Sequence, residues 1–147
     1  MKNLSLIFAA LIAAPCAFAD TKLELTGNDQ MQFNAKTLEA TAGEKVTLSF
    51  KHIGTLPVIA MGHNVVILKP GTSVPSFAAK CASAKDTGYL PQDPESKAAV
   101  VAATKLLGGG QSDSVEFTPT EPGAYPYICT FPGHFAIMQG VLTVKAK

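Results

Sequence analysis

The stretch CTFPGHFAIM, residues 129–138, places a thiol, an imidazole and a thioether within ten residues. Pro132 and Gly133 separate Cys129 from His134, and this residue pair favours a bend in the chain. A loop with such a bend, connecting two strands, can curl until Cys129, His134 and Met138 face one point. Copper prefers this donor set, because it accepts sulfur ligands in both redox states and imidazole suits the oxidised ion. The stretch therefore predicts part of a copper site.

A further strong ligand has to come from another part of the chain, and the remaining histidines are His52 and His63. Their positions alone do not choose between them. We favour His63, because Gly62 before it allows a close approach of the backbone. Asn64 after it is suited to hydrogen-bond around the ligands.

The rest of the chain shows the pattern of an all-β domain. Short alternating or β-branched segments are separated by turn signals rich in Gly, Pro, Asn and Asp, which is typical of an antiparallel sandwich or barrel. One segment departs from this pattern: residues 76–85 follow Pro75 with small, helix-tolerant residues and predict a short helix inserted between strands, near 75–85. Residues 97–103 are ambiguous between helix and strand. The expected strands are 22–25, 31–33, 45–50, 64–68, 114–117, 125–128 and 140–144.

Residues 1–19 have the features of a secretory signal peptide. Lys2 precedes an apolar run over residues 4–14, and Ala17-Phe18-Ala19 is typical of a cleavage site before Asp20. The run is too short to span a membrane. Cys16 offers the alternative of a lipid anchor, for which Pro15 is a poor neighbour. We therefore expect export and a periplasmic location, with residues 20–147 forming one domain.

Charge argues against two classes of partner. The chain contains no arginine, and without Lys2 its eleven lysines balance eleven acidic residues. Nucleic-acid binding depends on a positive field and on arginine side chains that read bases, so it is not expected. Strong electrostatic steering of a protein partner is not expected either.

Taken together, these residues resemble the azurins, bacterial type 1 (blue) copper proteins of the cupredoxin family. The resemblance extends over essentially all of residues 20–147. It is carried by GNDQMQF at 27–33, MGHN at 61–64, TKL at 104–106, DSV at 113–115 and CTFPGH at 129–134.

The resemblance implies an eight-stranded Greek-key sandwich and one bound copper ion. It places His63, Cys129 and His134 in the ligand plane, with Met138 and the Gly62 carbonyl on opposite axial sides. His52 is implied to be a nearby histidine that does not ligate copper. The implied function is one-electron transfer rather than catalysis, by a monomer whose redox partner proteins dock at an apolar patch around the exposed edge of His134.

Several other interpretations of the cysteines and histidines stay open from the sequence. Cys81 and Cys129 could form a disulfide, since exported proteins meet oxidising conditions. Cys129 could be a nucleophile with a histidine base, although no such motif surrounds it. Zinc could occupy the same ligands, and copper delivery is the main non-redox alternative. A copper enzyme with a second centre would need more than three histidines. If Cys81 is unpaired, we expect it to be partly exposed and able to link two molecules.

Overall fold

The computed structural model describes residues 20–147, so the predicted signal peptide and Cys16 lie outside the described residues. Eight strands form two sheets, with β1, β3 and β6 in one and β2, β8, β7, β4 and β5, in that order, in the other. The strands are β1 (Thr21–Gly27), β2 (Thr37–Thr41), β3 (Val46–His52), β4 (Val66–Leu68), β5 (Val100–Ala103), β6 (Ser112–Phe117), β7 (Gly123–Ile128) and β8 (Gln139–Lys145).

The predicted all-β sandwich of eight strands is confirmed, but its pairing is mixed rather than purely antiparallel. β1 pairs with β3 in parallel, and so does β2 with β8. The remaining pairs are antiparallel, including β7 with β8, whose connection carries the 129–138 loop. Alternation along β3 puts Val46, Leu48 and Phe50 in the core and leaves the residues between them partly or fully exposed.

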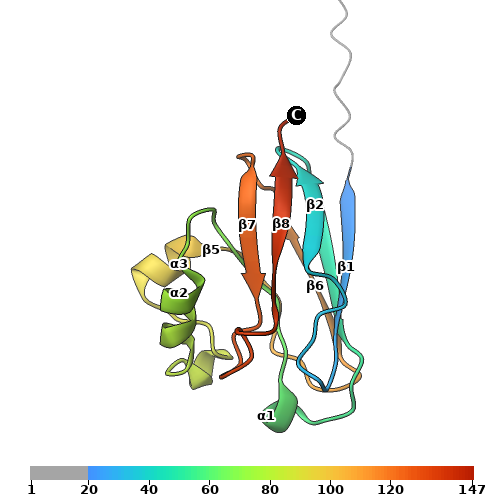
Figure 1. Cartoon of the computed structure of the whole chain (residues 1–147), viewed down its shortest axis with the longest axis vertical. Helices are drawn as coiled ribbons and strands as arrows, with labels where there is room; N and C mark the ends of the chain where they lie inside the picture. The colour runs from blue at the N-terminus through green and yellow to red at the C-terminus, as the bar shows by residue number, and fades with distance from the viewer. Residues whose placement is uncertain (1–19) are drawn as a thin grey trace, which may run out of the picture.

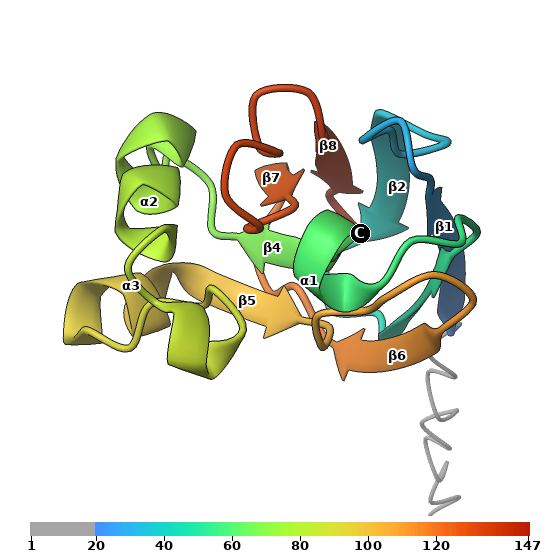
Figure 2. The same ribbon diagram turned by 90° about the horizontal axis from the view of Figure 1, so that it is seen from below.

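Helices lie outside the two sheets. Figure 1 shows α2 (Val74–Cys81) and α3 (Pro94–Ala99) beside the sandwich and α1 (Val58–Met61) at its lower end. Seen from that end in Figure 2, α1 lies in front of β4. A 3-10 turn, η1 (Lys85–Thr87), follows α2. The inserted helix α2 therefore begins two residues before the predicted segment 76–85 and ends four residues before the end of that segment. The ambiguous segment 97–103 contains the end of α3 and then β5.

One expected strand is absent and one observed strand was not expected. In the segment 31–33 only Phe33 pairs, through an isolated bridge to Gly27. The side-chain oxygen of Asn28 accepts hydrogen bonds from the backbone N–H groups of Gln30 and Gln32. These N–H groups therefore have partners without the backbone hydrogen bonds of a β-sheet. β2 was missed, since Thr37–Thr41 has one buried residue and weak alternation.

The hydrophobic core fills the space between the sheets, and Cys129 and Met138, two of the predicted metal ligands, belong to it. Tyr127 shows how tightly this core packs: its hydroxyl passes across Gly140 and donates a 2.7 Å hydrogen bond to the carbonyl of Ala35. A second cluster joins α2 to β4 and β7, through Phe77 and Cys81 on the helix side. The site is thus built at the end of a rigid scaffold.

Candidate metal centre

Two neighbouring antiparallel strands position the 129–138 loop. Cys129 directly follows β7, and Met138 directly precedes β8. The Cys129 N–H donates to the Met138 carbonyl at 2.9 Å, and the Met138 N–H donates to the His134 carbonyl at 2.8 Å. Gly133, with φ of +82°, turns the chain in the left-handed region between them. These contacts fix the curl that the sequence predicted.

His63 reaches the same point from a different part of the chain. It lies just before β4, where it pairs with Leu107 through two backbone hydrogen bonds of 2.9 and 2.8 Å. Its side chain is fully buried, like that of Cys129, and His134 is 4 % exposed. The structure therefore brings together His63, Cys129 and His134 in a nearly closed site.

The three ligand atoms form a compact triangle. The Cys129 sulfur lies 3.9 Å from Nδ1 of His63 and 3.7 Å from Nδ1 of His134, and the two Nδ1 atoms are 3.2 Å apart. The point equidistant from the corners of such a triangle is about 2.1 Å from each, which is the length of a metal–nitrogen bond in proteins. The donor set and its spacing therefore fit a metal ion in the plane of the three atoms.

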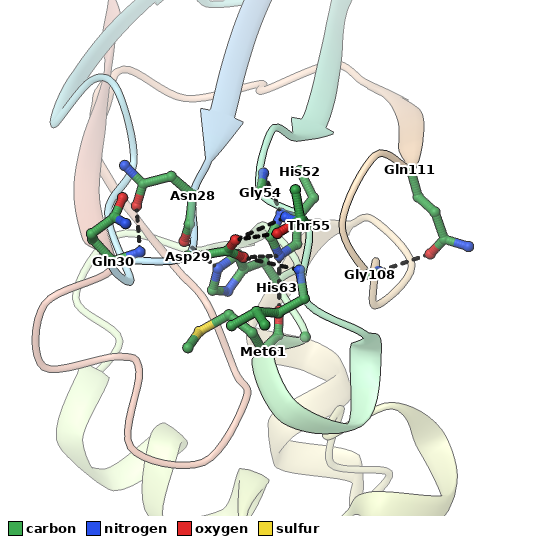
Figure 3. A network of polar contacts seen from close by, with 12 residues as sticks. Asn28, Asp29, Gln30, His52, Gly54, Thr55, Met61, His63, Gly108 and Gln111 are labelled. Atoms are coloured by element: carbon green, nitrogen blue, oxygen red, sulfur yellow. Dashed lines mark hydrogen bonds and ion pairs between the residues drawn. The ribbon is translucent and has the colours of Figure 1, made fainter.

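The hydrogen bonds of the two histidines on this side identify the one that faces the metal (Figure 3). His63 Nε2 donates to the Asn28 carbonyl at 2.8 Å, so Nδ1 keeps its lone pair for a ligand. His52 uses both ring nitrogens: Nδ1 accepts from the Gly54 N–H at 3.0 Å, and Nε2 donates to the Met61 carbonyl at 2.8 Å. His52 is buried and stacks on His63 with ring centroids 4.4 Å apart. It lies beside the site without facing it.

Burial keeps the metal-free site electrically neutral. Desolvation raises the pKa of the Cys129 thiol to about 11, while the N–H groups of Asn64 and Phe131 act in the opposite direction. Desolvation also lowers the pKa of His63, and it lowers the pKa of His134 to about 4 with help from the neighbouring histidines. At neutral pH both imidazoles therefore hold free lone pairs, and a metal needs to displace one thiol proton.

The two predicted axial groups lie close to the triangle. The Gly62 carbonyl is 3.8 Å from the Cys129 sulfur. Met138 is fully buried, and its methyl group and the His63 ring both pack against Gly27, where a Cβ would meet them at 3.3 and 3.2 Å. Gly27 thus provides the space in which Met138 and His63 approach each other.

Sequence reasoning did not recognise that the loop after β1 supports the site. Besides the Asn28 carbonyl that holds His63, the Asp29 carboxylate accepts hydrogen bonds from the N–H and hydroxyl of Thr55 at 2.8 and 3.2 Å (Figure 3). Gly54 passes so close to Asp29 that a Cβ there would overlap the carboxylate. The Gly27-Asn28-Asp29 signal indicated the turn, but no local pattern reveals a partner 26 residues away.

Two expectations about exposure need correction. The exposed edge predicted for His134 is small: the residue is 4 % exposed, because Phe131 covers its ring at a centroid distance of 4.7 Å, while Pro132 and Gly133 beside it are at the surface. Cys81 is 1 % exposed, because it lies on the inner face of α2. Both cysteines of residues 20–147 are unpaired, so the alternative of a disulfide between them is also wrong.

Comparison with known proteins decides the family. A family model described as copper binding proteins, plastocyanin/azurin family, matches residues 19–145. The chain belongs to this family. Azurin of Pseudomonas aeruginosa is 39 % identical over 146 residues, which cover 97 % of this chain and 93 % of that protein. Azurin-1 of Alcaligenes xylosoxydans xylosoxydans is 38 % identical over 128 residues, covering 84 % of this chain and 97 % of the relative.

Solved structures of the plastocyanin/azurin type share the fold. Auracyanin A, a "blue" copper protein of Chloroflexus aurantiacus, matches with a TM-score of 0.77 and 32 % identity, over 86 % of this chain and all of that one. An azurin from Methylomonas sp. strain J matches with a TM-score of 0.73 and 32 % identity, over 86 % and 98 % of the two chains. The buried His, Cys, His and Met residues of this family member are arranged as a copper site. Within residues 20–147, no helix is both long and apolar enough to cross a membrane.

Proposed function

We propose that this protein is a periplasmic single-electron carrier in which His63, Cys129 and His134 would hold one copper ion, with Met138 and the Gly62 carbonyl as the further groups beside it. Membership of the plastocyanin/azurin family implies copper-based electron transfer. The observation that carries the assignment of ligands is the triangle of sulfur and two Nδ1 atoms, each side between 3.2 and 3.9 Å. The signal-like residues 1–19 support export, with residues 20–147 as the cupredoxin domain.

Copper, when bound, supplies exchange of one electron between its cuprous and cupric forms. The chain keeps the ligands in one geometry for both forms. The Asn28 carbonyl holds His63, hydrogen bonds across the 129–138 loop hold Cys129 and Met138, and the core around them excludes water. Little rearrangement then accompanies a change of charge, which favours fast transfer.

The surface near His134 supports docking by apolar contact. Exposed apolar side chains gather on the loop before His63 and on α1, and Ile59 at the tip is 80 % exposed. Neither residues 53–62 nor residues 130–137 contain a charged side chain. Phe131 packs against Gly62, so the two segments form one surface, which we call the apolar end. Its exposed large apolar residues are Ile53, Leu56, Val58, Ile59 and Ile137.

A redox partner protein that approaches the apolar end comes within reach of the His134 ring through the exposed Pro132 and Gly133. Weak redox encounters bury less than about 1,200 Å² of surface, which suits a patch of this kind on a monomer. The alternative of copper delivery fits less well, because a delivery protein exposes its ligands, whereas these are 0–4 % exposed.

The visible spectrum after addition of cupric ion tests the proposal. We expect an intense blue colour from one copper per chain, lost on reduction and restored on oxidation. Cys129→Ser should abolish the band, because the thiolate is its source, whereas the matched control Cys81→Ser should keep it. Binding of several cuprous ions per chain without a visible band would instead identify a storage or delivery protein.

A further inference from the structure

Aromatic rings continue outward from the metal site in a row. The Phe131 ring lies 4.7 Å from the His134 ring between centroids, and the Tyr89 ring meets Phe131 edge-on at 5.2 Å. On the inner side, His134 is 5.0 Å from His63. Ring pairs at these distances attract each other beyond simple burial. Tyr89, 45 positions before His134 in the chain, is therefore linked to a predicted ligand through a single intervening ring.

His134 depends on this packing more than His63 does. The outer nitrogen of His63 is held by the Asn28 carbonyl at 2.8 Å. The outer nitrogen of His134, Nε2, has no hydrogen-bond partner among residues 20–147, since its ring contacts are through Nδ1 at the site. Metal-binding histidines are usually oriented by a bond from the second nitrogen. For His134, the contact on the outer side is the Phe131 ring, at a centroid distance of 4.7 Å.

Phe131 is in turn held from two sides. A Cβ on Gly62 would lie 2.9 Å from its Cδ2, so one side of the ring is against the backbone of the His63 loop. The second contact is with the Tyr89 ring, which meets the Phe131 ring in an edge-on arrangement. Phe131 also packs against the hydrophobic core, and Tyr89 is the one aromatic ring besides His134 that contacts it among the described residues.

The backbone at Tyr89 is unusual for an aromatic residue. Its φ is +63°, in the left-handed region, directly after Gly88 with φ of +66°. A bulky side chain is rarely found there, where glycine or asparagine is more stable. The turn is closed by hydrogen bonds from the Tyr89 N–H to Ala84 at 2.8 Å and from the Thr87 hydroxyl to Leu90 at 2.7 Å. These bonds involve the Tyr89 backbone and the Thr87 hydroxyl, and neither involves the Tyr89 side chain.

We propose that Tyr89 is a positioning residue for the metal centre: it fixes Phe131, and Phe131 fixes the orientation of the His134 imidazole. This inference rests on the proposed copper site, with His134 as a ligand. Tyr89 does not touch the metal ligands itself. Its contribution is to keep the His134 ring in one orientation when the charge at the site changes.

Three variants test this role. Tyr89→Asn removes the ring and keeps a residue that tolerates the left-handed backbone. Tyr89→Phe keeps the ring and loses only the hydroxyl. Tyr125→Leu is the control: Tyr125 is a buried ring outside this row, it lies in β7 four residues before Cys129, and its hydroxyl donates to the Glu121 carbonyl.

In the metal-free protein, the proton NMR signals of the His134 ring should broaden and shift in Tyr89→Asn. In Tyr89→Phe they should match those of the unaltered protein. The affinity for Zn²⁺, measured by calorimetry, should fall about tenfold in Tyr89→Asn, the lower end of what loss of an orienting partner costs. The visible band of the cupric form should change position. Tyr125→Leu should lower stability and leave all three readouts unchanged.

Unchanged His134 signals and unchanged Zn²⁺ affinity in a folded Tyr89→Asn protein would overturn the inference. Equal changes in Tyr89→Phe, which keeps the ring, would also overturn it. Failure of the copper proposal itself is distinguishable. It would appear as missing metal binding by the unaltered chain, while the NMR comparison without metal would still decide whether Tyr89 holds His134.

Discussion

The side-chain amide of Asn64 makes two hydrogen bonds to Thr130 and thereby ties together the two loops of the metal site. Nδ2 donates to the Thr130 hydroxyl at 2.7 Å, and the Thr130 N–H donates to Oδ1 at 2.8 Å. Both residues are 2 % exposed. Because Asn64 follows His63 and Thr130 follows Cys129, this pair keeps the imidazole and the sulfur at a fixed separation.

Asn64→Ala should destabilise the metal-free protein by about 2–4 kcal/mol, since it leaves a buried N–H and a buried hydroxyl without partners. Urea unfolding measures this loss. Asn34→Ala is the matched control, because the exposed Asn34 accepts one bond, from the Thr26 N–H at 2.7 Å. It should cost about 1 kcal/mol or less. Equal losses in the two variants would contradict the role given to Asn64.

Gly27→Ala should disturb the site by crowding it. The added methyl group would meet Phe50 at 3.1 Å, His63 at 3.2 Å and Met138 at 3.3 Å. We expect a loss of about 1–3 kcal/mol in stability, typical of overpacking, together with weaker metal binding by calorimetry. Adding Phe50→Leu removes the nearest atom and should restore part of both. Unchanged metal affinity in Gly27→Ala would show that His63 and Met138 have room to move.

Asp29 should make stability depend on acid pH. Hydrogen bonds from the Thr55 backbone, and further bonds from Leu56 and the Thr55 hydroxyl, hold the pKa of Asp29 below its usual value. A lowered folded-state pKa stabilises the protein above the unfolded-state pKa of about 3.9, and this stabilisation is lost as the pH falls through the folded-state value. In Asp29→Asn that loss should be absent.

Urea unfolding at pH 7 and near pH 3 measures the difference. The unaltered protein should lose more stability between these two pH values than Asp29→Asn does. Asp20→Asn, at the exposed residue just before β1, is the control and should behave like the unaltered protein. Parallel losses in the unaltered protein and Asp29→Asn would mean that the bonds between Asp29 and Thr55 form equally well with a neutral side chain.

Cys81 should be inert in the native state. Its thiol donates to the Phe77 carbonyl at 3.4 Å, and burial, with a smaller effect of Cys129, raises the pKa of Cys81 to about 12. Because the thiolate is the reactive form, a thiol reagent should modify the chain from Asp20 onward slowly when native and at two sites after unfolding. One thiol that reacts at the unfolded rate, or dimers on a non-reducing gel, would contradict this.

Local sequence predicted the strands wherever alternation was strong. The expected strand 45–50 forms most of β3 (Val46–His52), and the Pro-Gly bend between Cys129 and His134 forms as expected. Prediction failed where long-range pairing decides. Thr37–Thr41 becomes a strand because β8 lies beside it in parallel, and α1 forms from four apolar residues of which none is buried. Neither feature leaves a periodic pattern in the chain.

By itself, the sequence determined the chemistry of the site: a thiol, an imidazole and a thioether at fixed spacing, with histidines elsewhere to complete it. Only the tertiary structure decided which histidine completes it. His52 and His63 are stacked 4.4 Å apart, so proximity does not separate them. The backbone around His52 occupies both of its ring nitrogens, whereas His63 is held by one nitrogen and turns the other toward Cys129. A lone pair is available to a metal only where folding has left it without a hydrogen bond from the backbone.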